Sequence, residues 1–591
     1  MRVSSMALVI LLLFFTLGTA VLTTSLYRVQ VDDVARFRKS FEQQATRRIS
    51  IPGHRGRITD RHGMVLADSR PSHDIVCHPE SFRRSGGLSN TVDAIEADIV
   101  RLAAVLRLQP AVERRRIVRH LREASALPLT VWRDIDDGAL ARFSERTTDF
   151  PGFSEVLRAE RIYPCGSLAA HVVGYTGRGR PAIESGDTVV HYFEDLEVRG
   201  RSGVESFYDS FLAGAPGERR VRVDARGFCM DAGMVEREPE HGPELRLTID
   251  SGIQRALEEA LAGVLGAGVV LDPRDGAVLA MASMPTFNPD EWRSRHRELL
   301  SDPARPLYNR ALSGLYPPGS IFKPITAVAA LLRAAEDPGF TWTPDELYDC
   351  PGVFVLGDMR LHCWDRYGHG PIPLRAAIEK SCNAYFCNLG YRLGTNSLFR
   401  AAREFGLGAC TGIDLNGETA GAISGEPWYV GHTCQTAIGQ GLLLVTPLQM
   451  AVACAVFANG GKVFAPYLHL RDGGGRPVVP VRTVHCPADG FETVRNGMRD
   501  VEEIGTGRRI RTRYGENRER FNLKVTCAGK TGTAERGRGR KDTWIMAFAP
   551  FENPTIAMAM VVENGESGGK TTAPLAHRVL ASIFGEEEVT Q

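Results

Sequence analysis

Two serines in this chain stand three residues before a lysine, and their surroundings differ. Ser320-Ile321-Phe322-Lys323 follows a Pro-Pro-Gly turn and opens an apolar helix, whereas Ser567 and Lys570 lie in a glycine-rich loop that fixes neither side chain. Residues three apart share one face of a helix, so we expect Lys323 one turn beyond Ser320. A hydroxyl becomes a good nucleophile when an adjacent base, such as a desolvated amine, takes its proton. The first motif therefore predicts a serine nucleophile with a lysine base.

Two further motifs supply groups that such a nucleophile needs. Ser381-Cys382-Asn383 follows an amphipathic stretch, and Lys530-Thr531-Gly532-Thr533 directly follows the apolar run 523–527, which we expect to be a strand. An edge strand with a cationic lysine, two hydroxyls and a glycine without a side chain would hold a peptide carboxylate beside the serine. The order Ser-x-x-Lys, Ser-x-Asn, Lys-Thr-Gly is the signature of the penicillin-binding and β-lactamase serine enzymes.

The chain resembles the class B penicillin-binding proteins, and most of all the elongation-type transpeptidases of the penicillin-binding protein 2 family. The resemblance extends from about Arg55 to Ala573. In its first N-terminal motif His62 stands where asparagine is usual, which affects a local turn and not the chemistry. The similar segments outside the catalytic motifs are Arg55–Gly63, Arg161–Pro164 with His171 and Gly174-Tyr175, Gly200–Glu205, Leu247–Asp250, Ala437–Gly441 and Thr446–Gln449.

This resemblance implies a peptidoglycan D,D-transpeptidase that β-lactams inactivate. Ser320 would attack the penultimate D-alanyl carbonyl of a stem peptide, release the terminal D-alanine and form an acyl-enzyme. The amine of a neighbouring stem peptide would then resolve the acyl-enzyme and form the cross-link. The remaining roles would fall to Lys323 as the base, Ser381 as a proton relay, Asn383 as the residue that orients the acyl-peptide, Lys530, Thr531, Gly532 and Thr533 as the substrate-binding strand, and the N–H groups of Ser320 and Thr533 as the oxyanion hole.

Other functions share the three motifs. A septal class B transpeptidase would carry out the same reaction at cell division, but the segments Gly368–Gly370 and Ser381–Phe386 favour the elongation type. A D,D-carboxypeptidase or a β-lactamase would hydrolyse the acyl-enzyme, and the long N-terminal module and anchor count against both. A β-lactam sensor, or a scaffold without cross-linking activity, is the non-enzymatic alternative.

An apolar N-terminal segment is the membrane signal in the sequence. Met6–Leu22 contains 17 residues without a charge, near the lower limit of about 20 for a spanning helix. A cleaved signal peptide is the alternative because Gly18-Thr19-Ala20 resembles a cleavage site, but the length of the run favours an uncleaved single-pass anchor. The resemblance implies that the anchor lies in the bacterial inner membrane, with the catalytic domain in the periplasm. It also implies a membrane-embedded glycan polymerase and cell-shape complex proteins as partners, because no segment resembles a glycosyltransferase domain.

The charges are balanced but their composition is uneven. The 591 residues include 71 Lys+Arg and 70 Asp+Glu, and this net charge of +1 argues against nucleic acid as a partner. Only eight of the cationic residues are lysines, and 63 are arginines. Arginine cannot be deprotonated in a protein, so a lysine within a chemical motif is informative.

The pattern of apolar and polar residues around these motifs predicts a multidomain chain of the α+β or α/β class. We expect a polar helix over 27–50, a helix within 93–126, strands within 130–223, and a strand over 245–249 that leads into a helix capped near Asp250-Ser251. The following alternation of strands and helices fits the antiparallel sheet flanked by helices that the resemblance implies, with loops at 472–475 and 565–570. The predicted divisions are 1–26, a cytoplasmic stub and transmembrane anchor; 27–244, an elongated, strand-rich pedestal of the dimerisation type; 245–585, the serine penicillin-binding transpeptidase domain; and 586–591, a tail.

Three of the twelve cysteines form a spaced set with one histidine. Cys350, Cys363, His369 and Cys382 read Cys-x12-Cys-x5-His-x12-Cys, and three thiolates with one imidazole are a ligand set that structural zinc prefers. The alternative is a Cys350–Cys363 disulfide, a buried His369 and a free Cys382. Of these two possibilities we expect the structural zinc, and we expect no organic cofactor. The remaining cysteines show no pattern, and those in apolar runs are expected in the core.

Overall fold

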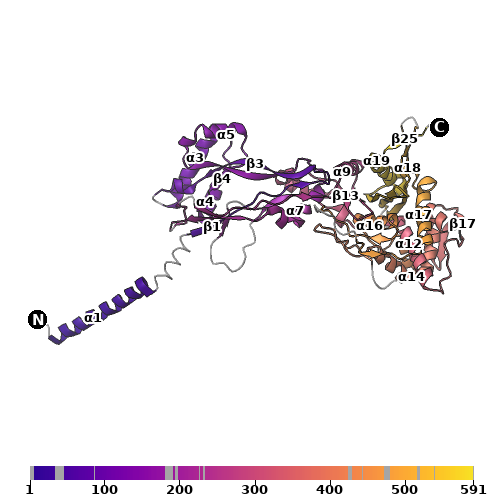
Figure 1. Cartoon of the computed structure of the whole chain (residues 1–591), viewed down its shortest axis with the longest axis horizontal. Coiled ribbons are helices and arrows are strands. Elements are labelled where there is room, and N and C mark those ends of the chain that lie inside the picture. The colour runs from indigo at the N-terminus through magenta and orange to yellow at the C-terminus, as the bar shows by residue number, and fades with distance from the viewer. Residues whose placement is uncertain are drawn as a thin grey trace.

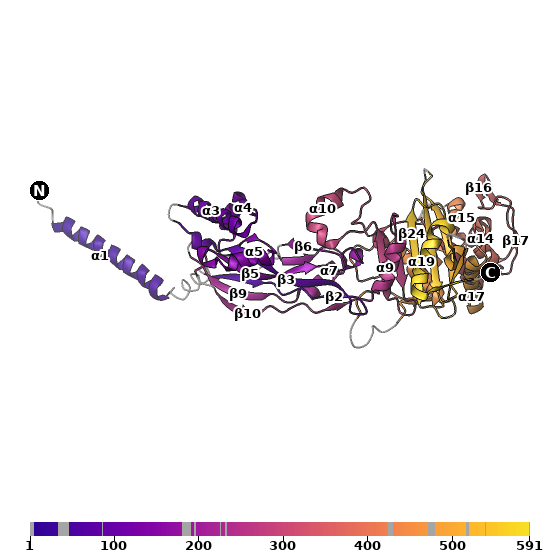
Figure 2. The ribbon, with the colours of Figure 1, turned by 90° about the horizontal axis from the view of Figure 1, so that it is seen from above.

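The computed structural model has an elongated shape with three parts. Figures 1 and 2 show the apolar helix α1 at one end, a strand-rich pedestal in the middle and a compact catalytic domain at the other end. The fold class predicted from the sequence is confirmed, whereas the predicted domain boundaries stay predictions. The structure describes residues 5–32, 46–84, 87–179, 191–193, 197–224, 226–230, 233–423, 429–441, 443–470, 479–515, 519–537 and 539–589.

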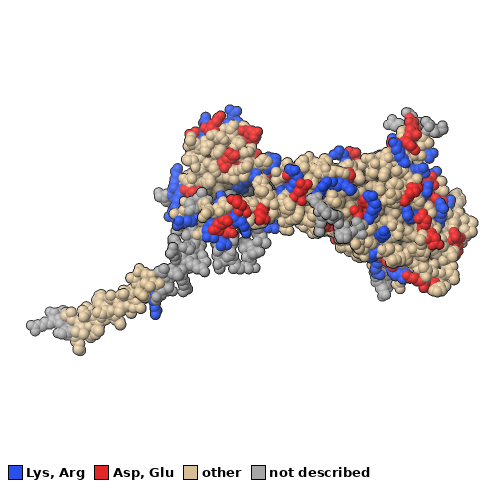
Figure 3. All heavy atoms as spheres, viewed as in Figure 1, with Lys and Arg blue, Asp and Glu red and all other residues tan. Residues whose placement is uncertain are grey.

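The N-terminal helix α1 (Ser5–Tyr27) exposes its apolar side chains along its whole length. The helical span Leu8–Val31, 24 residues long, has a mean hydropathy of 2.2, so it is long and apolar enough to cross a membrane. In Figure 3 the helix is almost free of charged side chains, whereas acidic and basic side chains are interspersed over the visible face of the other two parts.

The polar helix expected over 27–50 is wrong at its C-terminal end. Residues 27–32 are helical, at the end of α1 and in a π-helical turn over Arg28–Asp32; residues 33–45 lie outside the described residues, and Thr46–Ile51 form the strand β1. This strand pairs antiparallel with β9 (Gly217–Arg222) and parallel with β7 (His191–Phe193). The error arises because partners more than 140 residues away supply the hydrogen bonds, and short polar segments carry little periodicity of their own.

The pedestal contains two larger sheets, with helices packed on one of them (Figure 1), and a two-stranded sheet of β6 (Thr176–Gly179) and β8 (Glu197–Gly200). One sheet has the order β10-β9-β1-β7, and the other has the order β11-β2-β3-β4 with β5 paired to β3. A buried apolar cluster joins the second sheet to its helices. The elements not yet given bounds are β2 (Ile58–Thr59), β3 (Val65–Cys77), β4 (Leu129–Trp132), β5 (Phe153–Ile162), β10 (Met234–Arg237), β11 (Leu245–Arg246), α3 (Leu88–Leu106), α4 (Arg114–Glu123) and α5 (Asp137–Ser144).

The three N-terminal motifs of the sequence meet in one buried ion network. Arg55 Nε lies 2.5 Å from Glu205 Oε2, and Arg161 Nε lies 2.7 Å from Glu205 Oε1. Arg55, Arg161 and Glu205 come from the three similar segments that begin at Arg55, at Arg161 and at Gly200, and Glu205 is fully buried. Removing one partner would leave an uncompensated buried charge, which costs about 3–5 kcal/mol. The network therefore fixes strand β5, the segment that leads into β2, and helix α7 (Gly203–Phe207) relative to one another.

The catalytic domain is built on a five-stranded antiparallel sheet of order β13-β12-β24-β23-β22. Successive side chains on its central strands pack on opposite faces: Val269 joins the cluster that contains α16, and Val270 joins the cluster that contains α9 and α19. The Asp250 side chain caps α9, as the sequence predicts. The bounds are β12 (Gly266–Leu271), β13 (Val278–Met284), β22 (Ala528–Glu535), β23 (Lys541–Ala549), β24 (Ile556–Glu563), α9 (Ser251–Ala260), α16 (Pro447–Ala458) and α19 (Ala573–Phe584).

Candidate active site

Ser320 lies in a short 3-10 turn, Gly319–Phe322, that leads directly into helix α12 (Lys323–Glu336). The preceding Gly319 has a φ of +58°, and a Cβ added there would lie 2.9 Å from the carbonyl oxygen of Thr533. Only glycine combines this backbone conformation with this close approach. The turn therefore holds Ser320 against the strand that carries the Lys-Thr-Gly motif.

Lys323 is fully buried at the start of α12, and its ammonium group has three oxygen partners. Nζ donates to the backbone oxygen of Ser381 at 2.8 Å, to Asn383 Oδ1 at 2.7 Å and to Ser381 Oγ at 3.2 Å. Burial lowers the pKa of the Lys323 ammonium to about 8, and the nearby Cys382 and Cys363 thiols oppose that shift. The amine is thus held where it can give up its proton near neutral pH.

Ser381 lies between helices α13 (Leu374–Glu379) and α14 (Asn383–Glu404) with a φ of +52°. A residue with a side chain pays roughly 1–3 kcal/mol for such a conformation, and such strain is concentrated at functional sites. Lys530 Nζ donates to Ser381 Oγ at 2.8 Å, so one hydroxyl contacts both buried lysines. Burial and the neighbouring Lys323 charge lower the pKa of Lys530 well below its usual value.

The Lys-Thr-Gly motif lies within an edge strand, β22, as expected from the sequence. The apolar run before it, however, does not form one strand: Arg520–Leu523 is β21, which pairs with β20 (Thr512–Tyr514) and β25 (Glu586–Glu588) in another sheet. A Cβ added at Gly532 would lie 3.1 Å from Pro318 O and from Ile321 Cγ2. The missing side chain therefore also lets the nucleophile turn pack on the strand.

The second Ser-x-x-Lys match does not assemble a comparable site. The expected loop is a π-helical turn over Gly568–Thr572, and the exposed Lys570 pairs with Glu566. The backbone N–H of Gly568 donates to Thr533 Oγ1 at 3.2 Å, so this turn supports β22. We could not have predicted that support from the sequence, because the contact joins residues that no local pattern connects. The loop expected at 472–475 lies outside the described residues.

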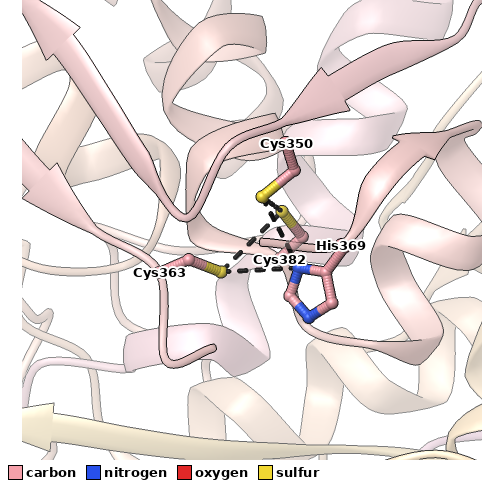
Figure 4. A group of neighbouring side chains, drawn as sticks. All are labelled: Cys350, Cys363, His369 and Cys382. Carbon is pink, nitrogen blue, oxygen red and sulfur yellow. Dashed lines mark hydrogen bonds between the residues drawn. The ribbon is translucent and has the colours of Figure 1, made fainter. Parts of the chain in front are cut away.

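The four residues of the predicted zinc set come together around one point beside the Ser-x-Asn motif (Figure 4). Cys382 Sγ lies 3.3 Å from Cys350 Sγ and 3.9 Å from Cys363 Sγ, and His369 Nδ1 lies 3.6 Å from both Cys350 Sγ and Cys363 Sγ. Tetrahedral zinc, about 2.3 Å from sulfur and about 2.0 Å from nitrogen, would separate its ligands by roughly 3.5–3.8 Å. The donors fit that ion, and the Cys350 and Cys363 thiols are free, unlike in the disulfide alternative.

Helix α14 ties this cluster to the catalytic residues. Cys382 occupies its N-cap position, where Sγ accepts a hydrogen bond from the Tyr385 N–H at 3.4 Å. The hydrogen bond between Cys363 and Cys382, together with the N–H groups of Asn383 and Ala384, lowers the pKa of Cys363, and the same hydrogen bond raises the pKa of Cys382. Whatever fixes Cys382 therefore also fixes Ser381 and Asn383, its two neighbours in the chain.

Two family models match this chain. A penicillin binding protein transpeptidase domain covers residues 266–581, and a penicillin-binding protein dimerisation domain covers residues 50–247. The "Peptidoglycan D,D-transpeptidase MrdA" of Haemophilus influenzae is 30% identical over 95% of this chain and 89% of its own length. The protein of the same name from Escherichia coli K12 is also 30% identical, over 96% of this chain and 92% of its own length.

Solved structures agree with these relatives. Helicobacter pylori penicillin-binding protein 2, solved in complex with MreC, has a TM-score of 0.75 at 25% identity and covers 91% of this chain and 98% of its own. Pseudomonas aeruginosa PBP2, solved with WCK 5153, has a TM-score of 0.63 at 30% identity and covers 90% and 96%. The chain belongs to the penicillin-binding protein family. Within that family it is a class B protein of the elongation type, related to penicillin-binding protein 2.

Proposed function

We propose that this protein is a peptidoglycan D,D-transpeptidase of cell elongation that joins stem peptides through an acyl-enzyme on Ser320, and that β-lactams target it. The observation that carries the proposal is the row of hydrogen bonds from Lys530 through the Ser381 hydroxyl to Lys323. Lys323 begins the helix into which the Ser320 turn leads, one turn beyond the nucleophile, so a proton leaving Ser320 has an acceptor and a return path.

The buried lysines carry the proton transfers in this reaction. Lys323 takes the proton of Ser320 as the hydroxyl attacks the carbonyl, and Ser381 passes a proton to the leaving amine of D-alanine. Asn383 holds the base, because its Oδ1 accepts from Lys323 Nζ, and its amide is itself fixed by the bond that Nδ2 donates to His362 O at 3.1 Å. The backbone N–H groups of Ser320 and Thr533 bind the oxyanion, and one such donor contributes about 2.7–4 kcal/mol.

The experiment that tests this function locates the acylated serine. The full-length protein is labelled with a fluorescent penicillin and digested, and the labelled peptide is sequenced by mass spectrometry. We expect the adduct on the peptide that contains Ser320. An adduct on the peptide that contains Ser567, the other Ser-x-x-Lys match, would overturn the assignment.

We also propose that Cys350, Cys363, His369 and Cys382 hold a structural zinc ion. The ligand spacing, the mutual approach of the four donor atoms and the burial of the three cysteines support the site. Bound zinc would supply a closed tetrahedral cross-link and no open coordination position for chemistry. Cys382, as the N-cap residue of α14, fixes the start of that helix and with it the positions of Ser381 and Asn383.

Replacing Cys363 with serine is expected to remove the metal. Elemental analysis should give about one zinc per chain in the wild type and less than about 0.2 in the variant. The unfolding temperature of the variant should also be at least about 3 °C lower, because an ion that binds only the folded protein stabilises it, and the variant loses that ion. Cys410→Ser is the matched control, since Cys410 is exposed and outside the cluster. Wild-type protein with no zinc and with its thiols paired as disulfides would contradict the proposal.

We infer that α1 anchors the protein once in the bacterial inner membrane, with the catalytic domain in the periplasm. The single described helix of sufficient length and apolarity supports one crossing. A glycan polymerase in the membrane and cell-shape proteins are the partners that we propose. Two solved relatives support such assemblies: one is the complex with MreC, and another, with a TM-score of 0.68 and 30% identity, is described as a peptidoglycan synthase complex that coordinates polymerisation and crosslinking.

A further inference from the structure

We propose that Arg536 is a positioning residue for acylation, because it ties the segment that carries Ser320 to two carboxylates at the end of the catalytic sheet. Arg536 is the first residue after β22, in the hairpin that leads to β23. The proposal rests on Ser320 being the nucleophile. It concerns a residue outside the three sequence motifs, and no charge in those motifs performs this role.

On one side, Arg536 holds the chain just before the nucleophile turn. Its Nη2 donates to the backbone oxygen of Leu315 at 3.2 Å, and its guanidinium carbon lies 4.8 Å from the centre of the Tyr316 ring. A guanidinium over an aromatic ring contributes about 0.5–2 kcal/mol, depending on its exposure. Both contacts fall within five residues of Ser320, so they limit how that segment can move.

On the other side, Arg536 contacts carboxylates of two neighbouring strands. Nε lies 2.6 Å from Asp542 Oδ2 on β23, and Nη1 lies 3.9 Å from Glu563 Oε2 on β24. Asp542 is only 1% exposed, so its charge depends on this partner. Glu563 in turn accepts from the Tyr316 hydroxyl at 2.9 Å and pairs with Arg310 at 3.1 Å. Glu563 on the sheet therefore contacts both Arg536 and Tyr316, and Tyr316 belongs to the segment that carries Ser320.

Two other contacts hold the same segment to the domain. Trp544 Nε1 donates to Pro317 O at 2.9 Å, and the Gly319 N–H donates to Gly439 O at 2.8 Å. Arg536 is therefore one of several ties, and its loss should displace Ser320 without unfolding the domain. A misplacement of about 1 Å at a reacting group can cost about 10²-fold in rate, so we expect a loss of about 10- to 100-fold.

The ion pair between Arg536 and Asp542 is sensitive to pH because Asp542 can take up a proton. Burial raises the pKa of Asp542 to about 6; the charges of Arg536 and Arg540 oppose the shift, and that of Glu563 adds to it. Behind Glu563 stand Arg310 and Tyr316. Asp542 is ionised above that pH and pairs with Arg536. The ion pair is lost as the pH falls through about 6.

The test measures the rate of acylation by a fluorescent penicillin in the full-length protein. We expect Arg536→Ala to be about 10- to 100-fold slower than wild type and Arg536→Lys to recover part of the loss. Arg540→Ala, which removes the same charge from the same hairpin, should acylate at the wild-type rate at pH 8, well above the range in which Asp542 takes up a proton. On acidification, wild-type acylation should slow first as the Lys323 base gains its proton near pH 8 and then in a further step near pH 6; Asp542→Asn should keep the first step and lack the second.

Each outcome bears on a defined claim. Arg536→Ala acylating at the wild-type rate, or Asp542→Asn retaining the step near pH 6, would overturn the positioning role. If Arg536→Ala does not fold, a wild-type rate in the folded Arg536→Lys variant together with a retained step near pH 6 in Asp542→Asn would overturn it as well. Labelling that persists in Ser320→Ala would instead show that the proposed function is wrong, so the two failures are distinguishable.

Discussion

Replacing Ser320 with alanine is expected to abolish covalent labelling by a fluorescent penicillin. The alanine variant keeps the turn Gly319–Phe322 and removes only the oxygen that forms the acyl bond. Loss of the nucleophile in a serine enzyme lowers turnover on the order of 10⁶-fold, so no labelled band should appear at any practical time. Gel fluorescence and the intact mass of the protein measure this directly.

Ser567→Ala is the matched control for that experiment. It alters the other Ser-x-x-Lys match, whose lysine is exposed and paired with Glu566, and it should label at the wild-type rate. Both variants should unfold near the wild-type temperature. A Ser320→Ala protein that gains the mass of the penicillin would contradict the nucleophile assignment.

Replacing Lys323 with methionine is expected to slow acylation by about 10²- to 10⁴-fold, the usual contribution of a general base. Methionine is unbranched and of similar length, but it offers no proton acceptor to Ser320 and no donor to Ser381 or Asn383. Acceptors left without a donor cost about 1–3 kcal/mol each, so the unfolding temperature is measured alongside the rate.

Two further variants separate the loss of the base from the other effects of replacing Lys323. Lys570→Met removes an exposed lysine and should leave the rate unchanged. Lys323→Arg keeps a charge and hydrogen-bond donors but cannot lose its proton, so it should remain slow even where it folds. A near wild-type rate in a folded Lys323→Met protein would show that another group is the base.

The scarcity of lysine in the sequence anticipated part of this site. Of the eight lysines, Lys323 and Lys530 are fully buried, and burial lowers the pKa of both. The sequence could place Lys323 one turn from Ser320, because that spacing is local. It could not place the Ser381 hydroxyl between the two amines, because that position depends on a positive φ and on strand β22 arriving from about 150 residues away.

The same distinction between local and distant contacts explains the remaining differences. The helix cap at Asp250 and the edge-strand character of the Lys-Thr-Gly motif followed from local patterns. The strand at Thr46–Ile51 and the supporting turn at Gly568–Thr572 depend on distant partners. The clustering of Cys350, Cys363, His369 and Cys382 was predicted from spacing, but its connection to Ser381 through the start of α14 became visible only in the folded chain.

The release of D-alanine with and without an amine acceptor tests transpeptidation most directly. The full-length protein is incubated with a stem peptide that ends in D-alanyl-D-alanine, and the products are resolved by mass spectrometry. We predict that the acceptor accelerates D-alanine release and that one cross-linked product forms for each D-alanine released. Release at the same rate with and without acceptor, giving only the shortened peptide with a free carboxyl group, would identify a carboxypeptidase and contradict this function.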